Sequence, residues 1–246
     1  MSALSTTDIV ILAGGLGKRL ASVTGGKQKI LAQIDGKPFI SVLIDYIAAQ
    51  GAKRFILCTG HDADSVESAI KDAHPGLTIV FSREQEPLGT GGAIKQASSL
   101  VESKQFIAMN GDCFCVIDYN ALIAHHRAKG AQATLGVTKV DDAREYGTIE
   151  LDQANNIAAF KEKQPWVNSA LINTGTYCLN REVFALVNTP QRFSIEYDFF
   201  PYLVGKGFCA FEVANQFIDI GTPDRYQWAQ EHLKYLSGKV KRFDLD

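Results

Sequence analysis

The sequence lacks the features that mark membrane, secreted and disulfide-stabilised proteins. It has no apolar run as long as a bilayer span, and its first residues, MSALSTTD, have neither the basic start nor the apolar core of a signal peptide. Five cysteines are scattered without C-x-x-C pairs, which indicates neither a disulfide framework nor a zinc site. We therefore expect a cytoplasmic protein with reduced, mostly buried thiols.

Neither sign of charge is in excess, and linkers and repeats are absent. The 25 basic and 27 acidic residues give no global field that would attract nucleic acid or an anionic membrane. The chain has 246 residues, 46% hydrophobic and 21% charged, with no low-complexity tract or Pro/Ser-rich linker. These values are ordinary for a globular protein, and we expect one domain over residues 1–246.

The stretch from Asp8 to Leu31 holds the strongest local signal. An apolar run, residues 9–12, is short and β-branched, as in a strand buried on both faces. The glycines that follow, Gly14, Gly15 and Gly17, leave backbone N–H groups free to surround an anion. Positive charge is added by Lys18, Arg19, Lys27 and Lys29. The pattern predicts a polyphosphate-binding loop, although an ordinary strand-to-helix turn with solvated cations has the same local composition.

Two familiar phosphate loops do not fit this stretch. A dinucleotide fingerprint that starts at Gly15 needs glycine or alanine where Leu20 stands. A P-loop that ends at Lys27 needs glycine at Ala21 and Ser or Thr at Gln28. An NAD-dependent dehydrogenase is therefore disfavoured. This stretch alone does not distinguish a polyphosphate-binding loop from an ordinary strand-to-helix turn.

The first half alternates strands and helices. Residues 54–59, 77–81 and 105–109 have strand patterns, and helices are expected at 39–47, at 62–71 and from a Thr90 cap to 101. Such alternation predicts a parallel sheet with ligands at the carboxyl ends of its strands. Asp112 follows one of these strands, so it suits a hard cation there, although it could equally cap a turn.

The second half has a different pattern. After a helix at 118–129, strand patterns joined by short turns occupy 133–140, 147–151, 156–161, 171–179 and 208–213, which indicates a more mixed or antiparallel part. A final helix is expected from Asp224 to about Leu236. His125 and His126 have no acidic or cysteine partner at metal-ligand spacing, so we interpret them as surface or packing residues.

Several separated motifs resemble those of the sugar-phosphate nucleotidyltransferases. The family signature G-G-x-G-x-R-L, completed by a lysine, is matched at positions 14–20 and at Lys29, with Ser22, Gln28 and Ile30 where prolines are usual. The resemblance continues through EPLGTGG (86–92), NGD (110–112), EYGT (145–148), FKEK (160–163), NTG (173–175) and FIDIGTP (217–223). Within the family, the chain is most similar to the D-glycero-alpha-D-manno-heptose 1-phosphate guanylyltransferases, because of EPLGTGGAIK, LINTGTYCL, FSIEYDFFP and FIDIGTPDRY.

The resemblance implies a fold, a reaction and a set of site residues. The fold is an α/β nucleotide-diphospho-sugar transferase sandwich, Rossmann-like and three-layered, without the C-terminal β-helix of some relatives. Residues 1–130 would bind mainly the nucleotide and 131–246 mainly the sugar phosphate. The implied catalytic residues are Arg19, Lys29, Asp112, Lys163 and Asp219, with Asp112 and Asp219 as Mg²⁺ ligands. The nucleotide would contact Leu12, Ala13, Gly14, Gly15, Gly17, Arg19, Glu84, Pro87, Gly89, Thr90, Asn110 and Asp112. The sugar phosphate would contact Lys29, Gly147, Glu162, Lys163, Asn173, Thr174 and Glu196.

The implied reaction joins a sugar 1-phosphate to a nucleoside triphosphate. A carboxylate can accept both N1–H and the amino group of guanine, so Glu84 favours GTP, and heptose 1-phosphate is the expected sugar. A uridylyl-, cytidylyl- or thymidylyltransferase stays open, as does a homodimer. A non-catalytic regulatory homologue is less favoured, because the loop cations and both metal carboxylates are present.

Overall fold

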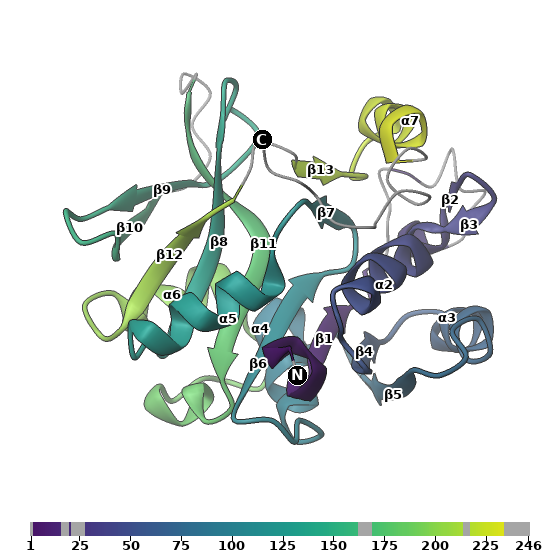
Figure 1. Ribbon diagram of the computed structural model, residues 1–246, viewed down its shortest axis with the longest axis horizontal. Helices are drawn as coiled ribbons and strands as arrows, with labels where there is room; N and C mark the ends of the chain where they lie inside the picture. Colours follow the sequence, from purple (N-terminus) through teal and green to yellow (C-terminus); the bar gives the residue numbers. More distant parts are fainter. Residues whose placement is uncertain (1, 16–19, 21–27, 162–168, 214–216, 234–246) are drawn as a thin grey trace.

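The computed structural model describes residues 2–15, 20, 28–161, 169–213 and 217–233, and a twisted sheet organises them (Figure 1). Nine strands of these residues form the sheet, and seven lie in the order β10-β9-β11-β6-β1-β4-β5. The four strands β1, β4, β5 and β6 are mutually parallel. They span Ile9–Leu12, Arg54–Thr59, Thr78–Arg83 and Gln105–Asn110. This parallel half confirms the alternation predicted from the sequence.

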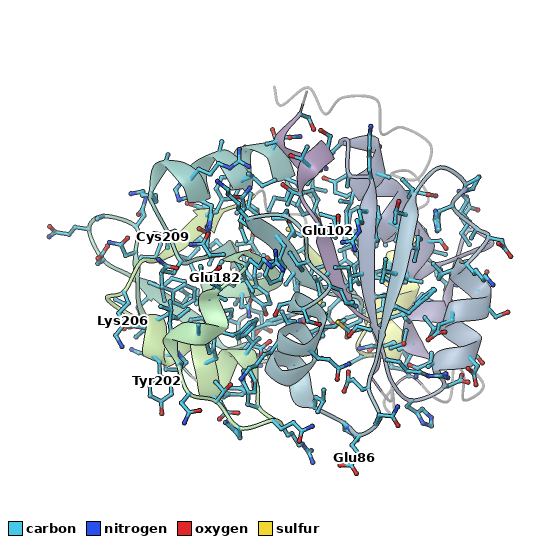
Figure 2. All side chains as sticks on the ribbon, turned by 90° about the horizontal axis from the view of Figure 1, so that it is seen from below. Glu86, Glu102, Glu182, Tyr202, Lys206 and Cys209 are labelled. Carbon is cyan, nitrogen blue, oxygen red and sulfur yellow. The ribbon has the colours of Figure 1, made fainter. Side chains whose placement is uncertain are left out.

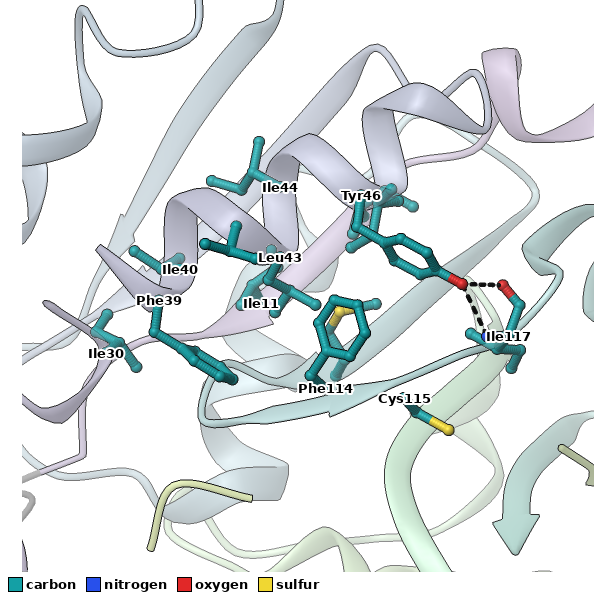
Figure 3. Close-up of a cluster of buried hydrophobic side chains, with 14 of the residues drawn as sticks. Ile11, Ile30, Phe39, Ile40, Leu43, Ile44, Tyr46, Phe114, Cys115 and Ile117 are labelled. Carbon is teal, nitrogen blue, oxygen red and sulfur yellow. Dashed lines mark hydrogen bonds between the residues drawn. The ribbon is translucent and has the colours of Figure 1, made fainter. Parts of the chain in front are cut away.

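Helices cover both faces of the parallel half. α2, α3 and α4 span Phe39–Ala49, Ala63–Ile70 and Gly89–Ser98. Figure 3 shows Phe39, Leu43 and Tyr46 of α2 lying beside Ile11 of β1, and all four side chains are buried. The buried Tyr46 hydroxyl donates to the carbonyl of Ile117 at 3.1 Å and accepts from its N–H at 3.0 Å. This pair of bonds satisfies the only polar group that α2 brings into the cluster shown.

The second half of the sheet is mixed, as the sequence predicted. Strand β11 is antiparallel to β6, β8 and β9, β10 is antiparallel to β9, and β12 is parallel to β8. The bounds are Ala133–Val140 for β8, Thr148–Leu151 for β9, Ile157–Lys161 for β10, Ala170–Asn180 for β11 and Phe208–Glu212 for β12. Strand β6 is therefore the boundary, with a parallel neighbour on one side and an antiparallel neighbour on the other.

Short helices complete this half. α5 (Tyr119–Ala128) is capped at its N-terminus by Asp118, whose carboxylate accepts from the Ala121 N–H at 2.9 Å. A π-helical turn, η5 (Ile195–Phe199), leads into α6 (Phe200–Leu203), and two short 3-10 turns lie at Ala3–Thr6 (η1) and Val183–Leu186 (η4). His126 is buried and hydrogen-bonded to Thr134 and Asn180, which confirms its packing role.

Two small sheets lie outside the large one. β2 (Gln33–Ile34) pairs with β3 (Lys37–Pro38), and β7 (Cys113–Cys115) pairs with β13 (Phe217–Asp219). In Figure 1, β7 and β13 lie side by side below α7 (Pro223–His232). Sequence reasoning missed this pairing, in which Asp219 lies opposite Cys113, next to Asp112. All five cysteines are free, and four of them are buried.

Candidate active site

Two cavities open at the carboxyl ends of the parallel strands and share one wall. The larger cavity, of about 670 Å³, is bounded by the turns after β1 and β4, the loop before α4 and the end of β6. The smaller cavity, of about 340 Å³, is bounded by β7, β10, β11, β13, η5 and the start of α7. The residues that line both cavities are Lys29, Asn110 and Asp112. The arrangement can therefore hold two ligands that meet at this shared wall.

The shared wall carries charge and an unpaired acceptor. Lys29, in a 3-10 turn (η3, Lys29–Leu31), forms an ion pair with Asp112, and both side chains are partly buried. The Oδ1 atom of Asn110 is buried and has no hydrogen-bond partner among the described residues. A buried acceptor without a partner is costly, so a ligand that donates to it here would be stabilised.

The glycine-rich turn after β1 forms one side of the larger cavity. Leu12, Gly14 and Gly15 line it. A side chain at position 14 would place its Cβ 3.3 Å from the Gly60 nitrogen and 3.4 Å from an oxygen of Glu84. A Cβ at Gly15 would meet nothing within 4 Å, so that backbone is open to a ligand. Gly14 is thus closely packed against its neighbours, and Gly15 leaves room.

Glu84 lies in the larger cavity with one oxygen already engaged. Its Oε2 accepts from the backbone N–H of Leu88 at 2.8 Å, which fixes the direction of the carboxylate. Burial raises the pKa of Glu84 above its usual value, and the Leu88 N–H opposes that rise. Pro87, Gly89 and Thr90 line the same cavity.

The expected Thr90 helix cap is wrong. α4 begins one residue earlier, at Gly89, and the Thr90 hydroxyl donates instead to Glu196 at 2.8 Å. Gly89 has a φ of +72°, which a residue with a side chain rarely adopts, and its Cβ would lie 2.6 Å from the Phe193 carbonyl oxygen. The local backbone therefore starts the helix at a glycine, and this frees the threonine for a long-range contact.

Asp219 lies in the smaller cavity and is held by three groups. Arg225 contacts its carboxylate at 2.8 and 3.1 Å, the Tyr146 hydroxyl donates at 2.9 Å and the Gly221 N–H at 2.9 Å. The Arg225 guanidinium also lies 5.1 Å from the centre of the Tyr146 ring. Burial, followed by the charge of Asp219, raises the pKa of Tyr146, so the hydroxyl stays protonated and remains a donor.

Sequence reasoning missed Arg225 and Tyr146. Both line the smaller cavity. Both also lie inside matched motifs, GTPDRY and EYGT, in which neither residue was assigned a role. A signal was present, because Arg225 is six residues after Asp219 and lies in the first turn of α7. Without the β7–β13 pairing, however, nothing in the sequence placed Tyr146 beside them.

The remaining predicted sugar-phosphate residues separate into three groups. Gly147, Asn173 and Glu196 line the smaller cavity. Thr174 does not: its hydroxyl is buried and donates to the Gly136 carbonyl at 2.9 Å, and its contact with the sugar phosphate stays a prediction. Strand alternation turns neighbours in β11 to opposite faces. Gly17, Arg19, Glu162 and Lys163 lie outside the described residues.

Ala13 lies behind the turn after β1, and its contact with the nucleotide stays a prediction. It is buried, and its N–H donates to the Cys58 carbonyl at 2.9 Å, so its backbone joins β1 to β4. It is not part of the lining of either cavity. Ala13 positions the turn after β1 and has no contact surface of its own in the larger cavity.

The donor set at the shared wall suits a hard cation. No cluster of three or more His, Cys, Asp or Glu side chains is found within the described ranges. Asp112, in the turn between β6 and β7, and Asp219, in β13, offer two carboxylates on the smaller cavity, and Mg²⁺ commonly takes one or two carboxylates together with phosphate oxygens and water. Both carboxylates are paired with cations, so neither is left as an uncompensated charge. These residues therefore fit a magnesium ion that arrives with a phosphate ligand.

The part of the chain that the structure describes contains no helix long and apolar enough to cross a membrane.

Comparison with known proteins identifies the family. A model of the nucleotidyl transferase family matches residues 8–235. The chain is 36% identical over 229 residues to the D-glycero-alpha-D-manno-heptose 1-phosphate guanylyltransferase of Aneurinibacillus thermoaerophilus, covering 93% of this chain and 99% of that protein. It is 34% identical over 220 residues to the enzyme of the same name from Campylobacter jejuni, covering 88% and 96%.

A solved structure gives the same result for the fold. HddC from Yersinia pseudotuberculosis, in a crystal structure with GMP-PN, superposes with a TM-score of 0.80 at 39% identity over 92% of this chain and 98% of that one. The fold is therefore the nucleotide-diphospho-sugar transferase α/β fold that the motifs predicted. The chain belongs to the nucleotidyl transferase family.

Proposed function

We propose that this protein condenses GTP with a sugar 1-phosphate, D-glycero-alpha-D-manno-heptose 1-phosphate, to give GDP-heptose and pyrophosphate in the cytoplasm. The single observation that carries the proposal is the pair of cavities that share Lys29, Asn110 and Asp112. A reaction between two phosphorylated substrates needs two pockets whose reacting ends meet at a wall with positive charge. The names of the two relatives above support guanine and heptose as the substrates.

The larger cavity suits the nucleotide. It contains the glycine turn, where the open backbone at Gly15 can approach phosphates, and the Glu84 carboxylate lies beside Gly14 on the same wall. In guanine, N1–H and the exocyclic amino group are adjacent donors, and a carboxylate accepts both. The bond from Leu88 holds one Glu84 oxygen, so the carboxylate has a defined orientation for this task.

The smaller cavity suits the sugar phosphate. Asn173 can donate to and accept from hydroxyl groups, and Gly147 lines the cavity with backbone that carries no side chain. Arg225 supplies a cation that stays charged at all relevant pH values. Lys163 and Glu162 remain predictions for this side, as does Arg19 for the triphosphate.

In the proposed reaction, an oxygen of the sugar 1-phosphate attacks the α-phosphorus of GTP. A new P–O bond forms, the bond from the α-phosphorus to the bridging oxygen breaks, and pyrophosphate leaves. No general base is needed, because the attacking phosphate is already ionised near neutral pH. Lys29 lies at the shared wall, where its charge can reduce the repulsion between the two anions. Asp112 and Asp219 would hold Mg²⁺, which when bound neutralises charge on the phosphates.

A substrate panel tests the proposal. GTP, CTP, UTP and dTTP are each offered with heptose 1-phosphate, mannose 1-phosphate and glucose 1-phosphate, and pyrophosphate release is measured. We expect the highest kcat/KM for GTP with heptose 1-phosphate. Equal turnover with dTTP would remove the guanine assignment, and a preference for UTP or CTP would favour the other nucleotidyltransferases. Absence of product from every pair would favour the regulatory homologue.

A further inference from the structure

Glu196 lies between the two cavities and contacts residues of both walls. It lines the smaller cavity, yet its Oε2 accepts from the hydroxyl of Thr90, which lines the larger cavity, at 2.8 Å. The same oxygen accepts from the Ser194 hydroxyl at 2.8 Å, and Oε1 accepts from the Tyr177 hydroxyl at 3.1 Å. Three hydroxyls from three separate segments thus converge on one carboxylate.

The larger-cavity side of this network is tightly built. The Thr90 oxygen accepts from the Ile195 N–H at 3.0 Å while its hydrogen goes to Glu196. The Phe193 carbonyl accepts from the Gly91 N–H at 3.0 Å, and the Phe193 N–H donates to the Leu88 carbonyl at 3.0 Å. The start of α4 and the segment before Glu196 are therefore one hydrogen-bonded unit.

The glycines of the GTGG motif serve this contact. A Cβ on Gly91 would lie 2.2 Å from the Phe193 ring and 2.9 Å from the Ile195 nitrogen. A Cβ on Gly92 would lie 2.5 Å from the Gln191 carbonyl oxygen. Such distances require backbone movement, so these two positions must be glycine for the two segments to touch. Movement of the η5 segment would move the wall of the larger cavity.

The smaller-cavity side continues the chain of hydrogen bonds. The Tyr177 hydroxyl accepts from the Asn173 side-chain N–H at 3.1 Å, and Asn173 Oδ1 accepts from the Gly175 N–H at 2.7 Å. Burial, followed by the charge of Glu196, raises the pKa of Tyr177, so the hydroxyl stays a donor. Tyr177 is fully buried and lines neither cavity. Its hydroxyl therefore connects Asn173, on the cavity wall, to Glu196.

We propose that Glu196 is a positioning residue that couples the two substrate sites, holding Thr90 for the nucleotide and Asn173 for the sugar in one hydrogen-bonded network. The proposal rests on the function proposed above. Its rival is the simpler role predicted from the sequence, in which Glu196 binds the sugar directly. A direct sugar contact would affect the sugar alone, whereas a coupling residue affects both substrates whichever side is changed.

Two conservative variants separate these roles. Thr90→Val removes the hydroxyl on the nucleotide side, and Tyr177→Phe removes the hydroxyl on the sugar side. Each hydroxyl donates to Glu196 and accepts one further bond, so we expect each variant to raise the KM for both substrates at least about fivefold, with a smaller change in kcat. Thr90→Ser keeps the hydroxyl and should restore the wild-type values. Calorimetric binding of GTP alone to Tyr177→Phe should also be about fivefold weaker, and this measurement needs no turnover.

The double variant gives the sharpest result. If both hydroxyls act through Glu196, Tyr177→Phe will raise the KM for GTP in the wild-type background but not in Thr90→Val, and Glu196→Gln will reproduce the double variant. Two results would overturn the coupling and leave the direct sugar contact. In one, the KM increases of the two single variants multiply in the double variant. In the other, Thr90→Val changes only the KM for GTP and Tyr177→Phe only the KM for the sugar phosphate.

The controls separate the coupling from folding and from the proposed function. Tyr202→Phe and Glu182→Gln change the same residue types at exposed positions, and Figure 2 shows Tyr202 pointing away from the body of the protein. Both should leave the KM values unchanged, and thermal unfolding checks that every variant is folded. An inactive wild type would refute the proposed function, whereas an active wild type with independent variants would refute only the coupling.

Discussion

Replacing Glu84 by glutamine tests guanine recognition more directly than any other single change. In the structure, Glu84 Oε2 accepts from the Leu88 N–H at 2.8 Å. A glutamine that keeps this bond must direct its amide NH₂ towards the cavity, because its carbonyl oxygen is the only acceptor left for Leu88. The NH₂ group would then face the N1–H and amino donors of guanine. The variant thus replaces two favourable hydrogen bonds by donor–donor contacts in a partly buried site.

The size of the loss follows from the charge of the acceptor. Hydrogen bonds to an ionised group each contribute about 1.5–3 kcal/mol, and an unpaired buried donor costs a similar amount. We therefore expect kcat/KM for GTP to fall at least about 100-fold in Glu84→Gln. Inosine triphosphate keeps N1–H but lacks the amino group, so its kcat/KM should fall only about tenfold. The preference for GTP over inosine triphosphate should then decrease by about tenfold.

The assay is pyrophosphate release at saturating sugar 1-phosphate with each of the two nucleotides. Glu182→Gln is the control, since it removes a carboxylate at an exposed position that lines neither cavity. It should leave the nucleotide preference unchanged. If Glu84→Gln lowers both rates by the same factor, Glu84 does not contact the amino group, and the assignment of guanine to this carboxylate is refuted.

Further predictions concern pH, the metal carboxylate, loop geometry and packing. Burial raises the pKa of Glu84, and only the ionised carboxylate can accept from both donors of guanine. Affinity for GTP should therefore be present above this raised pKa and lost as pH falls through it. Profiles of KM against pH for wild type and Glu84→Gln check this. Asp112→Asn should abolish Mg²⁺-dependent turnover while the thermal unfolding curve keeps its shape; retained activity would exclude Asp112 from the site. Gln28 donates to the His61 carbonyl and has a φ of −51°, close to that of proline. Gln28→Pro loses the hydrogen bond but fixes the same φ, so it should keep the KM for GTP. Gln28→Ala loses the bond without fixing φ, so it should raise this KM several-fold. Gly91→Ala should lower the free energy of unfolding by about 1–3 kcal/mol, measured in urea.

The sequence was sufficient to predict the parallel half of the fold, because local pattern and global topology agree there. Each buried strand is a short apolar run, and each crossover helix has an apolar stripe, so the pattern indicates the order of elements. The same rule places ligands at the carboxyl ends of the strands, where Leu12 and Asn110 are found. The strands of the second half were also predictable one by one. Their partners were not, since antiparallel pairing depends on contacts far apart in the sequence.

The hydrogen bonds of Thr90 and Thr174 could not be predicted from local motifs, and the physical cause is the same for both. Both residues were assigned from local motifs, one as a helix cap and one as a sugar ligand. In each case the hydroxyl finds a partner that is distant in sequence, Glu196 or Gly136. Short polar side chains can satisfy a hydrogen bond in several ways, and tertiary contacts decide which one is formed. The long-range bonds of Glu196 were invisible for the same reason.

The two-cavity site depends on the change of strand direction at β6. Parallel pairing with β1 brings Asn110 to the same edge as Leu12, its partner in the register. Antiparallel pairing on the other side brings the first part of β11 to that edge, since Met109 pairs with Thr176 and a Cβ on Gly175 would lie 2.6 Å from the Asn110 amide nitrogen. A wholly parallel sheet would have carried the next strand's loop to this edge. The reversal instead presents Asn173 and its network, so the topology itself places a second cavity against the first.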